Sequence, residues 1–276
     1  MQCADGDRDN ICRAMHSMDV LYNQTLRQLD KSFRRLEAML PPPQRMRHGN
    51  SFVYRYKEKT VHQALIQKLA RMVSGLHAAR LLCDNGFFQE QGAIQRMLDE
   101  FHEDIWFLAF GVMNRDLTQL HQDYLDAFYK EEFDPETGNP LLDRPMVPRR
   151  KIRAYLSRVE QQPYDPSSAV TLYHTIHSGY SGFVHGASSH IMDLWGGDPP
   201  QFHIHGMAGT PRQEMHRYDL YNPFFRAILS FAIAAKVFGD EKLCATLSAF
   251  NVEFDRLSGC NEAYQNAPSR PPLRNA

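Results

Sequence analysis

The chain has 276 residues, of which 43% are hydrophobic, so it is long enough to bury a sizeable core. Its 31 basic and 32 acidic side chains give a formal net charge of -1, which excludes a global attraction to nucleic acid or to an anionic membrane. Binding of that kind would need a local basic patch.

The cysteines and the apolar runs predict the compartment. Five cysteines are widely spread, odd in number and without a Cys-x-x-Cys pair, which favours a reduced protein over a disulfide scaffold. The acidic N-terminal residues lack the apolar segment of a secretory signal. The most apolar run, residues 223–238, is too short to cross a bilayer. We therefore expect a cytoplasmic protein with no membrane partner.

The first half of the sequence predicts four helices, because apolar residues recur there every three or four positions. The four are residues 11–40, 60–83, 88–113 and 116–131. Pro41-Pro42-Pro43 ends the first helix, and Asn85-Gly86 ends the second. Between these two helices, residues 51–57 alternate enough to predict a short strand.

The second half begins with a linker, since four prolines lie between residues 135 and 148. The basic run Arg149-Arg150-Lys151-Ile152-Arg153 then starts a short helix to about residue 160, and we interpret its charges as a solvated face. The capping-box pattern Thr210-Pro211-Arg212-Gln213 predicts a short helix after it. Longer helices are expected at three places. They are residues 165–195, 223–238 and 243–257. Residues 201–207 alternate like a strand and could pair with residues 51–57.

These elements predict a single all-α bundle of about seven or eight helices, with one small two-stranded β ribbon as an accessory. We find no internal repeat and no linker flanked by two complete cores. Residues 1–260 are therefore expected to form one helical domain. Residues 261–276, rich in Pro, Asn and Arg, are expected to be a disordered tail.

The helix expected from Asp165 to the Gly196-Gly197 stop carries an unusual polar stripe. At about 100° per residue, one face collects histidines and serines without any Lys or Glu. The stripe is His174, Ser178, Ser181, His185 and Ser189. Apolar residues flank it, so it is typical either of the lining of a polar cavity or of a buried hydrogen-bond network.

The helix at residues 88–113 changes character along its length. It is amphipathic up to Asp104 and apolar on all sides from Ile105 onward. Arg96, Glu100 and Glu103 lie one above another, and their line runs into the apolar half. Either these residues form a surface ion pair, or they form an Arg–carboxylate cluster at the mouth of a cavity.

Patterns for metal and cofactor chemistry are incomplete. His174 and His177, and Asp99 and His102, have the i,i+3 spacing of metal ligands, but a di-iron bundle needs Glu-x-x-His on two helices. No phosphate-binding loop and no Gly-x-Ser-x-Gly elbow occurs. We therefore expect no metal and no cofactor.

Two of these motifs resemble a known family. Arg96-x-x-x-Glu100 with its apolar continuation, and Ser181-Gly-Phe-Val-His185-Gly, are similar to the two signatures of a family of uncharacterised bacterial all-α proteins. The resemblance covers roughly residues 60–195. Such bundles are in turn similar to HEPN domains, many of which are RNases of toxin–antitoxin and phage-defence systems.

The HEPN signature is an Arg followed, after four to six residues, by a His. Arg96 and His102 have this spacing. On a straight helix, however, their side chains diverge by about 120°, and Met97 stands where a polar residue commonly follows that Arg. The sequence leaves open whether His102 or His185 is the functional histidine.

The function expected first is binding of a small molecule or nucleotide in a polar cavity between these two helices. Arg96, Glu100 and His185 are the candidate catalytic residues, and Glu103, His174, Ser178 and Ser181 the candidate ligand-binding residues. One alternative is a HEPN-type ribonuclease with RNA as its partner. The other is a non-enzymatic helical interaction protein, for which a homodimer is conceivable.

Overall fold

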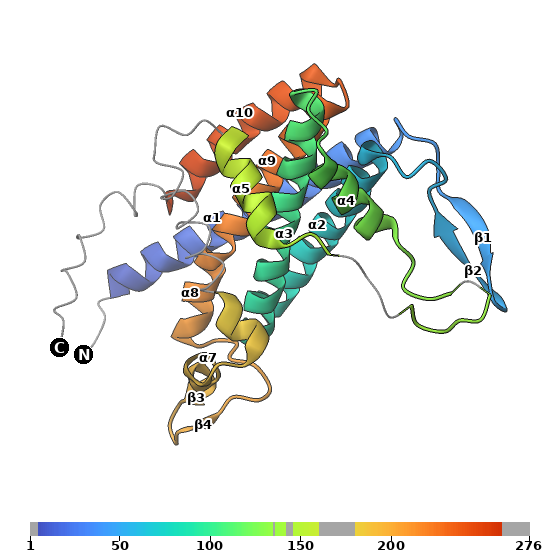
Figure 1. The fold of residues 1–276 in the computed structure, drawn as a ribbon. Helices are drawn as coiled ribbons and strands as arrows, with labels where there is room; N and C mark the ends of the chain where they lie inside the picture. The colour runs from blue at the N-terminus through green and yellow to red at the C-terminus, as the bar shows by residue number, and fades with distance from the viewer. Residues whose placement is uncertain (1–4, 135, 142–145, 160–179, 261–276) are drawn as a thin grey trace.

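The computed structural model describes residues 5–134, 136–141, 146–159 and 180–260, with side chains from residue 18 onward. Helices dominate it (Figure 1), which confirms the predicted all-α bundle with a small β ribbon. The helices are α1 (Asp5–Glu37), α2 (Val61–Asp84), α3 (Phe88–Met113), α4 (Gln119–Tyr129), α5 (Arg149–Val159), α7 (Ser188–Ile191), α8 (Pro211–Asp219), α9 (Tyr221–Val237) and α10 (Glu241–Ser258). The strands are β1 (Gln44–His48), β2 (Ser51–Arg55), β3 (Trp195–Gly196) and β4 (Gln201–Phe202).

Local signals in the sequence fix where the main helices begin and end. The Thr60 hydroxyl accepts a hydrogen bond from the amide of Gln63, whose side chain in turn accepts from the Thr60 amide, so a capping box starts α2. Asp240 caps α10 through the amide of Leu243. These helices therefore begin where unpaired backbone donors find a side-chain acceptor.

The core lies where α2, α3 and α9 pack together, with α1 and α10 against them (Figure 1). Its largest fully buried side chains come from all five helices. They include Tyr22, Leu69, Leu76, Phe107, Phe224, Phe231 and Phe254. α9 is rich in alanines that let neighbouring helices approach closely. None of the described helices is long and apolar enough to cross a membrane.

The β pairing differs from the one predicted. Residues 51–55 pair with residues 44–48 across the two-residue turn Gly49-Asn50, whereas β4 pairs with β3. The predicted pairing of residues 51–57 with 201–207 is therefore wrong. A two-residue turn brings adjacent strands together at a much smaller loss of chain entropy than a long connection.

The single long helix predicted from Asp165 to Gly197 is also wrong in its second half. Residues 180–185 are helical, but Gly186 has a φ of +62°, a left-handed conformation that ends a helix. α7, a 3-10 turn η1 (Met192–Leu194) and β3 follow. Ser189 therefore does not continue the predicted stripe. Residues 160–179, and the predicted tail 261–276, lie outside the described residues.

A pair of leucines on α2 tests which face of this helix is buried. Leu76 is 0% exposed and Leu81 is 65% exposed. Leu76→Ala should lower the free energy of unfolding by about 2–5 kcal/mol, because it leaves a cavity in the core. Leu81→Ala, the control, should change it by no more than about 0.5 kcal/mol. Urea unfolding of both variants measures this, and equal losses would contradict the packing of α2.

Candidate functional site

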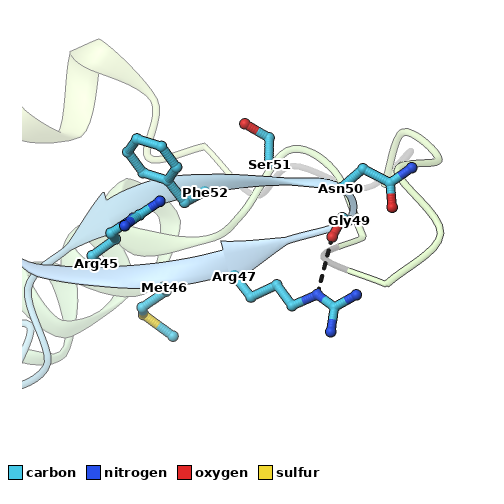
Figure 2. A pocket seen from close by; sticks show the side chains of 7 residues that line it. All are labelled: Arg45, Met46, Arg47, Gly49, Asn50, Ser51 and Phe52. Carbon is cyan, nitrogen blue, oxygen red and sulfur yellow. Dashed lines mark hydrogen bonds between the residues drawn. The ribbon is translucent and has the colours of Figure 1, made fainter.

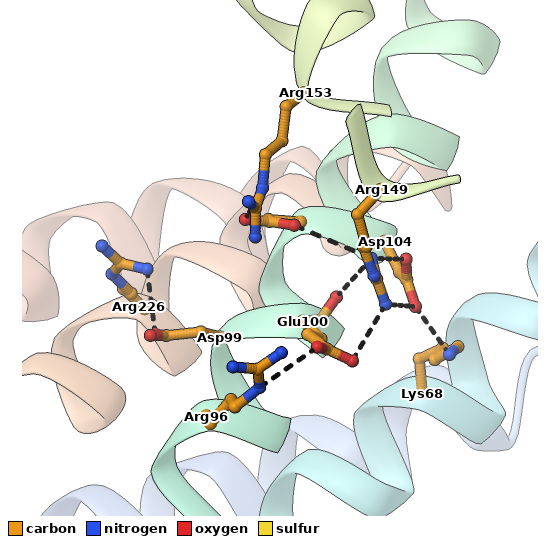
Figure 3. Close-up of polar contacts among 9 residues, drawn as sticks. Lys68, Arg96, Asp99, Glu100, Asp104, Arg149, Arg153 and Arg226 are labelled. Carbon is orange, nitrogen blue, oxygen red and sulfur yellow. Dashed lines mark hydrogen bonds and ion pairs between the residues drawn. The ribbon is translucent and has the colours of Figure 1, made fainter. Parts of the chain in front are cut away.

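A cluster of charged side chains surrounds the middle of α3 (Figure 3). Four carboxylates of α3 meet cations from α2, α3, α5 and α9. The carboxylates are Asp99, Glu100, Glu103 and Asp104, and the cations are Lys68, Arg96, Arg149, Arg153 and Arg226. We call these nine residues the α3 cluster.

Asp104 ties three helices together. Its side chain is almost fully buried, and its oxygens lie 2.7 Å from the Lys68 ammonium and 2.5 Å from the Arg149 guanidinium. Arg149 also donates to the backbone carbonyl of Glu100 and lies 3.5 Å from its carboxylate. Because one buried carboxylate holds cations from α2 and α5 at once, it fixes both helices on α3.

Lys68 reaches Asp104 through an aromatic enclosure. Its ammonium lies 4.9 Å from the ring centre of Phe101 and 5.1 Å from that of Phe128. The rings shield this ion pair from water and add cation–π attraction. They also bring α4, which carries Phe128, into the same region.

Two further ion pairs of the cluster are also largely buried. Arg153 of α5 donates to Glu103 at 2.9 Å, and Arg226 of α9 donates to Asp99 at 2.9 Å. Burial raises the pKa of both carboxyl groups, and the arginines oppose this rise without cancelling it. These carboxyl groups therefore hold protons more strongly than exposed ones.

The interpretation of residues 149–153 as a solvated face is wrong for two of its residues. Arg150 is exposed, but Arg149 is half-buried and Arg153 is only 8% exposed. Both arginines face α3, because four carboxylates there need cations that α3 itself cannot supply. A signal was present in the i,i+4 spacing of Arg149 and Arg153 beside the apolar Ile152, which places all three toward the core.

The structure brings together three of the predicted site residues. Arg96 lies 3.7 Å from Glu100, and Glu103 belongs to the same cluster. The polar stripe of α3 is thus an Arg–carboxylate cluster that runs into the core, the second of the two interpretations. Sequence reasoning missed Asp99, Asp104 and the arginines of α5 and α9.

His185 belongs to the helical residues 180–185 rather than to α3. It is exposed, and between described residues no hydrogen bond or ion pair joins it to Arg96 or Glu100. Ser181, four residues earlier, is half-buried. His174 and Ser178 lie outside the described residues.

The helical residues 180–185 nevertheless pack beside α3. A Cβ at Gly92 would lie 2.6 Å from the Phe183 ring, so only glycine allows this close approach. Further along, Gln89 donates to the carbonyl of His190 at 2.6 Å. Both contacts involve the first turns of α3, before Glu100 in the chain.

Several buried polar groups of the α3 region have atoms without a hydrogen bond. Four of these atoms are Gln95 Nε2, Asp99 Oδ2, Glu103 Oε2 and Arg153 Nη2, which make no hydrogen bond in the described structure, although the Arg149 guanidinium lies 3.7 Å from Glu103 Oε2. Their residues are between 2% and 9% exposed. Gln95, Asp99 and Glu103 are spaced i,i+4,i+8 and so lie one above another on α3. The charge of Arg153, bound to Glu103, also acts on Asp99. The four therefore form one adjoining set.

His102, the histidine of the HEPN-like spacing, has a different environment. It is buried, and its Nδ1 lies 2.8 Å from the Ser230 hydroxyl of α9. Burial, with a smaller effect from Arg226, lowers its pKa to about 3. His102 is therefore neutral at physiological pH and joins α3 to α9 through a hydrogen bond.

The described residues contain no group of three or more side chains that could hold a metal ion. Comparison of the chain with known protein families, with curated proteins and with solved structures found no match. The class that the structure defines is thus an all-α bundle with a buried, mixed-charge cluster on its central helix.

Removing one partner of a buried ion pair tests the cluster. Arg153→Met leaves Glu103 buried without its closest cation and should lower the free energy of unfolding by about 3–5 kcal/mol. Adding Glu103→Met should restore most of this loss, since the unpaired charge disappears. Arg150→Met is the exposed control and should change stability little. Denaturant unfolding measures the wild type, Arg153→Met, Glu103→Met, the double variant and the control, and simple additivity of the two single losses would contradict the pairing.

Burial of neutral His102 predicts a pH-dependent stability. Its folded-state pKa lies below the unfolded value of about 6.5, so the unfolded state binds the proton first as the pH falls. The contribution is fully present above pH 6.5 and decreases below it. When the pH falls from 7.5 to 5, the free energy of unfolding of the wild type should decrease by about 2 kcal/mol more than that of His102→Gln. Urea titrations at both pH values measure the difference, and parallel losses would contradict it.

Proposed function

We propose that the α3 cluster binds a small, uncharged polar ligand that carries both hydrogen-bond donors and acceptors, such as a nucleobase or nucleoside. The observation that carries this proposal is the adjoining set of four unused atoms. Gln95 and Arg153 offer N–H donors, while Asp99 and Glu103 offer carboxylate acceptors.

Energetics favour an exchangeable partner at these atoms. A buried polar atom without a partner costs about 1–3 kcal/mol, and folded proteins keep few of them. Three such atoms lie within about two turns of α3, and the fourth belongs to Arg153 of α5. Together they are a large local cost in folding free energy. A ligand with N–H groups toward the carboxylates and C=O groups toward Gln95 and Arg153 would remove it.

Charge balance supports an uncharged ligand. Five cations surround four carboxylates, so the cluster is close to neutral, and Arg153 and Arg226 each bind a carboxylate already. A highly anionic ligand such as a free triphosphate would meet the buried carboxylate oxygens of Asp99 and Glu103. Planar rings with alternating donors and acceptors suit this mixture better.

The same residues would supply the chemistry if a reaction follows binding. Carboxyl groups with raised pKa act as proton donors or acceptors near neutral pH in many active sites. In this proposal Asp99 and Glu103 take that role, and the Arg96–Glu100 pair orients the outer part of the ligand. Ser181 remains a candidate contact from the neighbouring helix. The HEPN-type alternative would need His102, whose burial and hydrogen bond to Ser230 favour a structural role.

Gln95→Met tests the proposal without unfolding the protein. The variant removes an unused donor, so its melting temperature in the absence of ligand should equal or exceed that of the wild type. A nucleoside and nucleobase panel should raise the melting temperature of the wild type by several degrees near saturation, and it should do so much less in the variant. Differential scanning fluorimetry with calorimetric titration of any hit measures this.

Gln122→Met on the exposed side of α4 is the matched control and should respond like the wild type. No stabilisation by any member of the panel would contradict the proposal and favour the non-enzymatic interaction protein. If a ligand stabilised the wild type and Gln95→Met equally, its binding site would lie elsewhere than at the α3 cluster.

A further inference from the structure

The β1–β2 hairpin stands at the side of the bundle, beyond α4 (Figure 1). Its base is anchored to the end of α4. Arg55 forms two hydrogen bonds with Glu131, at 2.6 and 2.8 Å, and Tyr129 donates to the carbonyl of Thr60. The hairpin is thus held at one end, while its turn at Gly49-Asn50 reaches into solvent.

The two faces of the hairpin differ in composition. In the register of β1 and β2, Arg45 lies opposite Tyr54 and Arg47 lies opposite Phe52. Directly opposed residues share a face, so one face consists of two arginines and two aromatic residues. The other face includes Val53 and Arg55, which are partly buried against the bundle. We call the first the Arg/aromatic face.

The Arg/aromatic face is open to solvent. Phe52 is 45% exposed and Tyr54 is 58% exposed, with their rings edge to face at 5.7 Å. The Arg45 guanidinium lies over the Phe52 ring at 3.8 Å, and Figure 2 shows the two side chains together beside an open hollow. Two neighbouring aromatic rings that are both exposed to solvent are typical of a surface that binds a partner.

Charge identifies the partner. Residues 44–59 contain five Lys and Arg residues and a single acidic one, Glu58, although the whole chain has a net charge of -1. The hairpin and the residues that follow it are therefore a local basic segment of the kind that nucleic-acid binding requires. An apolar protein surface would leave the arginines unpaired, and a duplex would offer phosphates but no free base for the rings.

We propose that the Arg/aromatic face binds single-stranded nucleic acid. Phe52 and Tyr54 stack on successive bases, and Arg45 and Arg47 bind the adjoining phosphates. Stacking on exposed aromatic residues with basic neighbours is the general mode of single-strand binding, and it tolerates any base sequence. The site is separate from the α3 cluster and does not depend on the ligand proposed there.

Fluorescence anisotropy with labelled oligo-uridine, oligo-thymidine and a DNA duplex tests the proposal on the full chain. We expect single strands to bind with about micromolar Kd and the duplex more weakly. Phe52→Ala and Tyr54→Ala should each weaken single-strand binding about tenfold. Arg45→Ala should weaken it too and lower the slope of log Kd against log salt by about one. The two oligonucleotides distinguish RNA from DNA as the source of the strand, and binding of either supports the proposal.

Met46→Ala, on the same strand but the opposite face, is the control and should bind like the wild type. All variants change exposed side chains, and equal melting temperatures establish that each is folded. Three results would each overturn the proposal: no binding of any single strand, unchanged affinity in both ring variants, or a labelled polyglutamate peptide bound as tightly as the oligonucleotides.

Discussion

The burial of carboxylates on α3 is the constraint on which the arrangement of the other helices depends. An ionised carboxylate cannot remain in a protein interior without a cation and hydrogen bonds. Asp104 is almost fully buried and is satisfied only when Lys68 of α2 and Arg149 of α5 reach it together. Asp99 and Glu103 impose the same condition on Arg226 of α9 and Arg153 of α5. The positions of α2, α5 and α9 around α3 are thus set by charge as well as by apolar packing.

These pairs are better understood as setting specificity than as adding stability. Desolvation of both partners offsets much of their attraction, whereas the loss of one partner is costly. The apolar second half of α3, with Ile105 and Phe107 fully buried, supplies the hydrophobic contribution in the same helix. α3 therefore combines a half that drives folding with a half whose charges select one packing of the surrounding helices.

The two proposed sites differ in how the fold supports them. The α3 cluster lies among packed helices, where Asp99, Glu103 and Arg153 are nearly fully buried. The Arg/aromatic face lies on a two-stranded hairpin anchored through Arg55 and Glu131, where rings and guanidinium groups stay accessible. A buried site suits a small ligand read by hydrogen bonds. An exposed, basic one suits a flexible polymer read by stacking and charge.

The sequence by itself determined the helical class and the bounds of α2 and α3, with α3 predicted at Phe88–Met113, because periodicity and caps are local properties. It also placed Arg96, Glu100 and Glu103 on one stripe that runs into the core. The spacing of Arg149 and Arg153 beside Ile152 indicates one helix face, but only the tertiary structure decided which carboxylates they meet, since these partners lie about fifty residues away in the chain. The tertiary structure decided the β1–β2 pairing, because alternation does not specify a partner strand. It also decided where the helix of residues 180–185 stops, since a glycine such as Gly186 can either continue a helix or end it. In the structure Gly186 ends the helix, and Phe183 and His190 both contact α3.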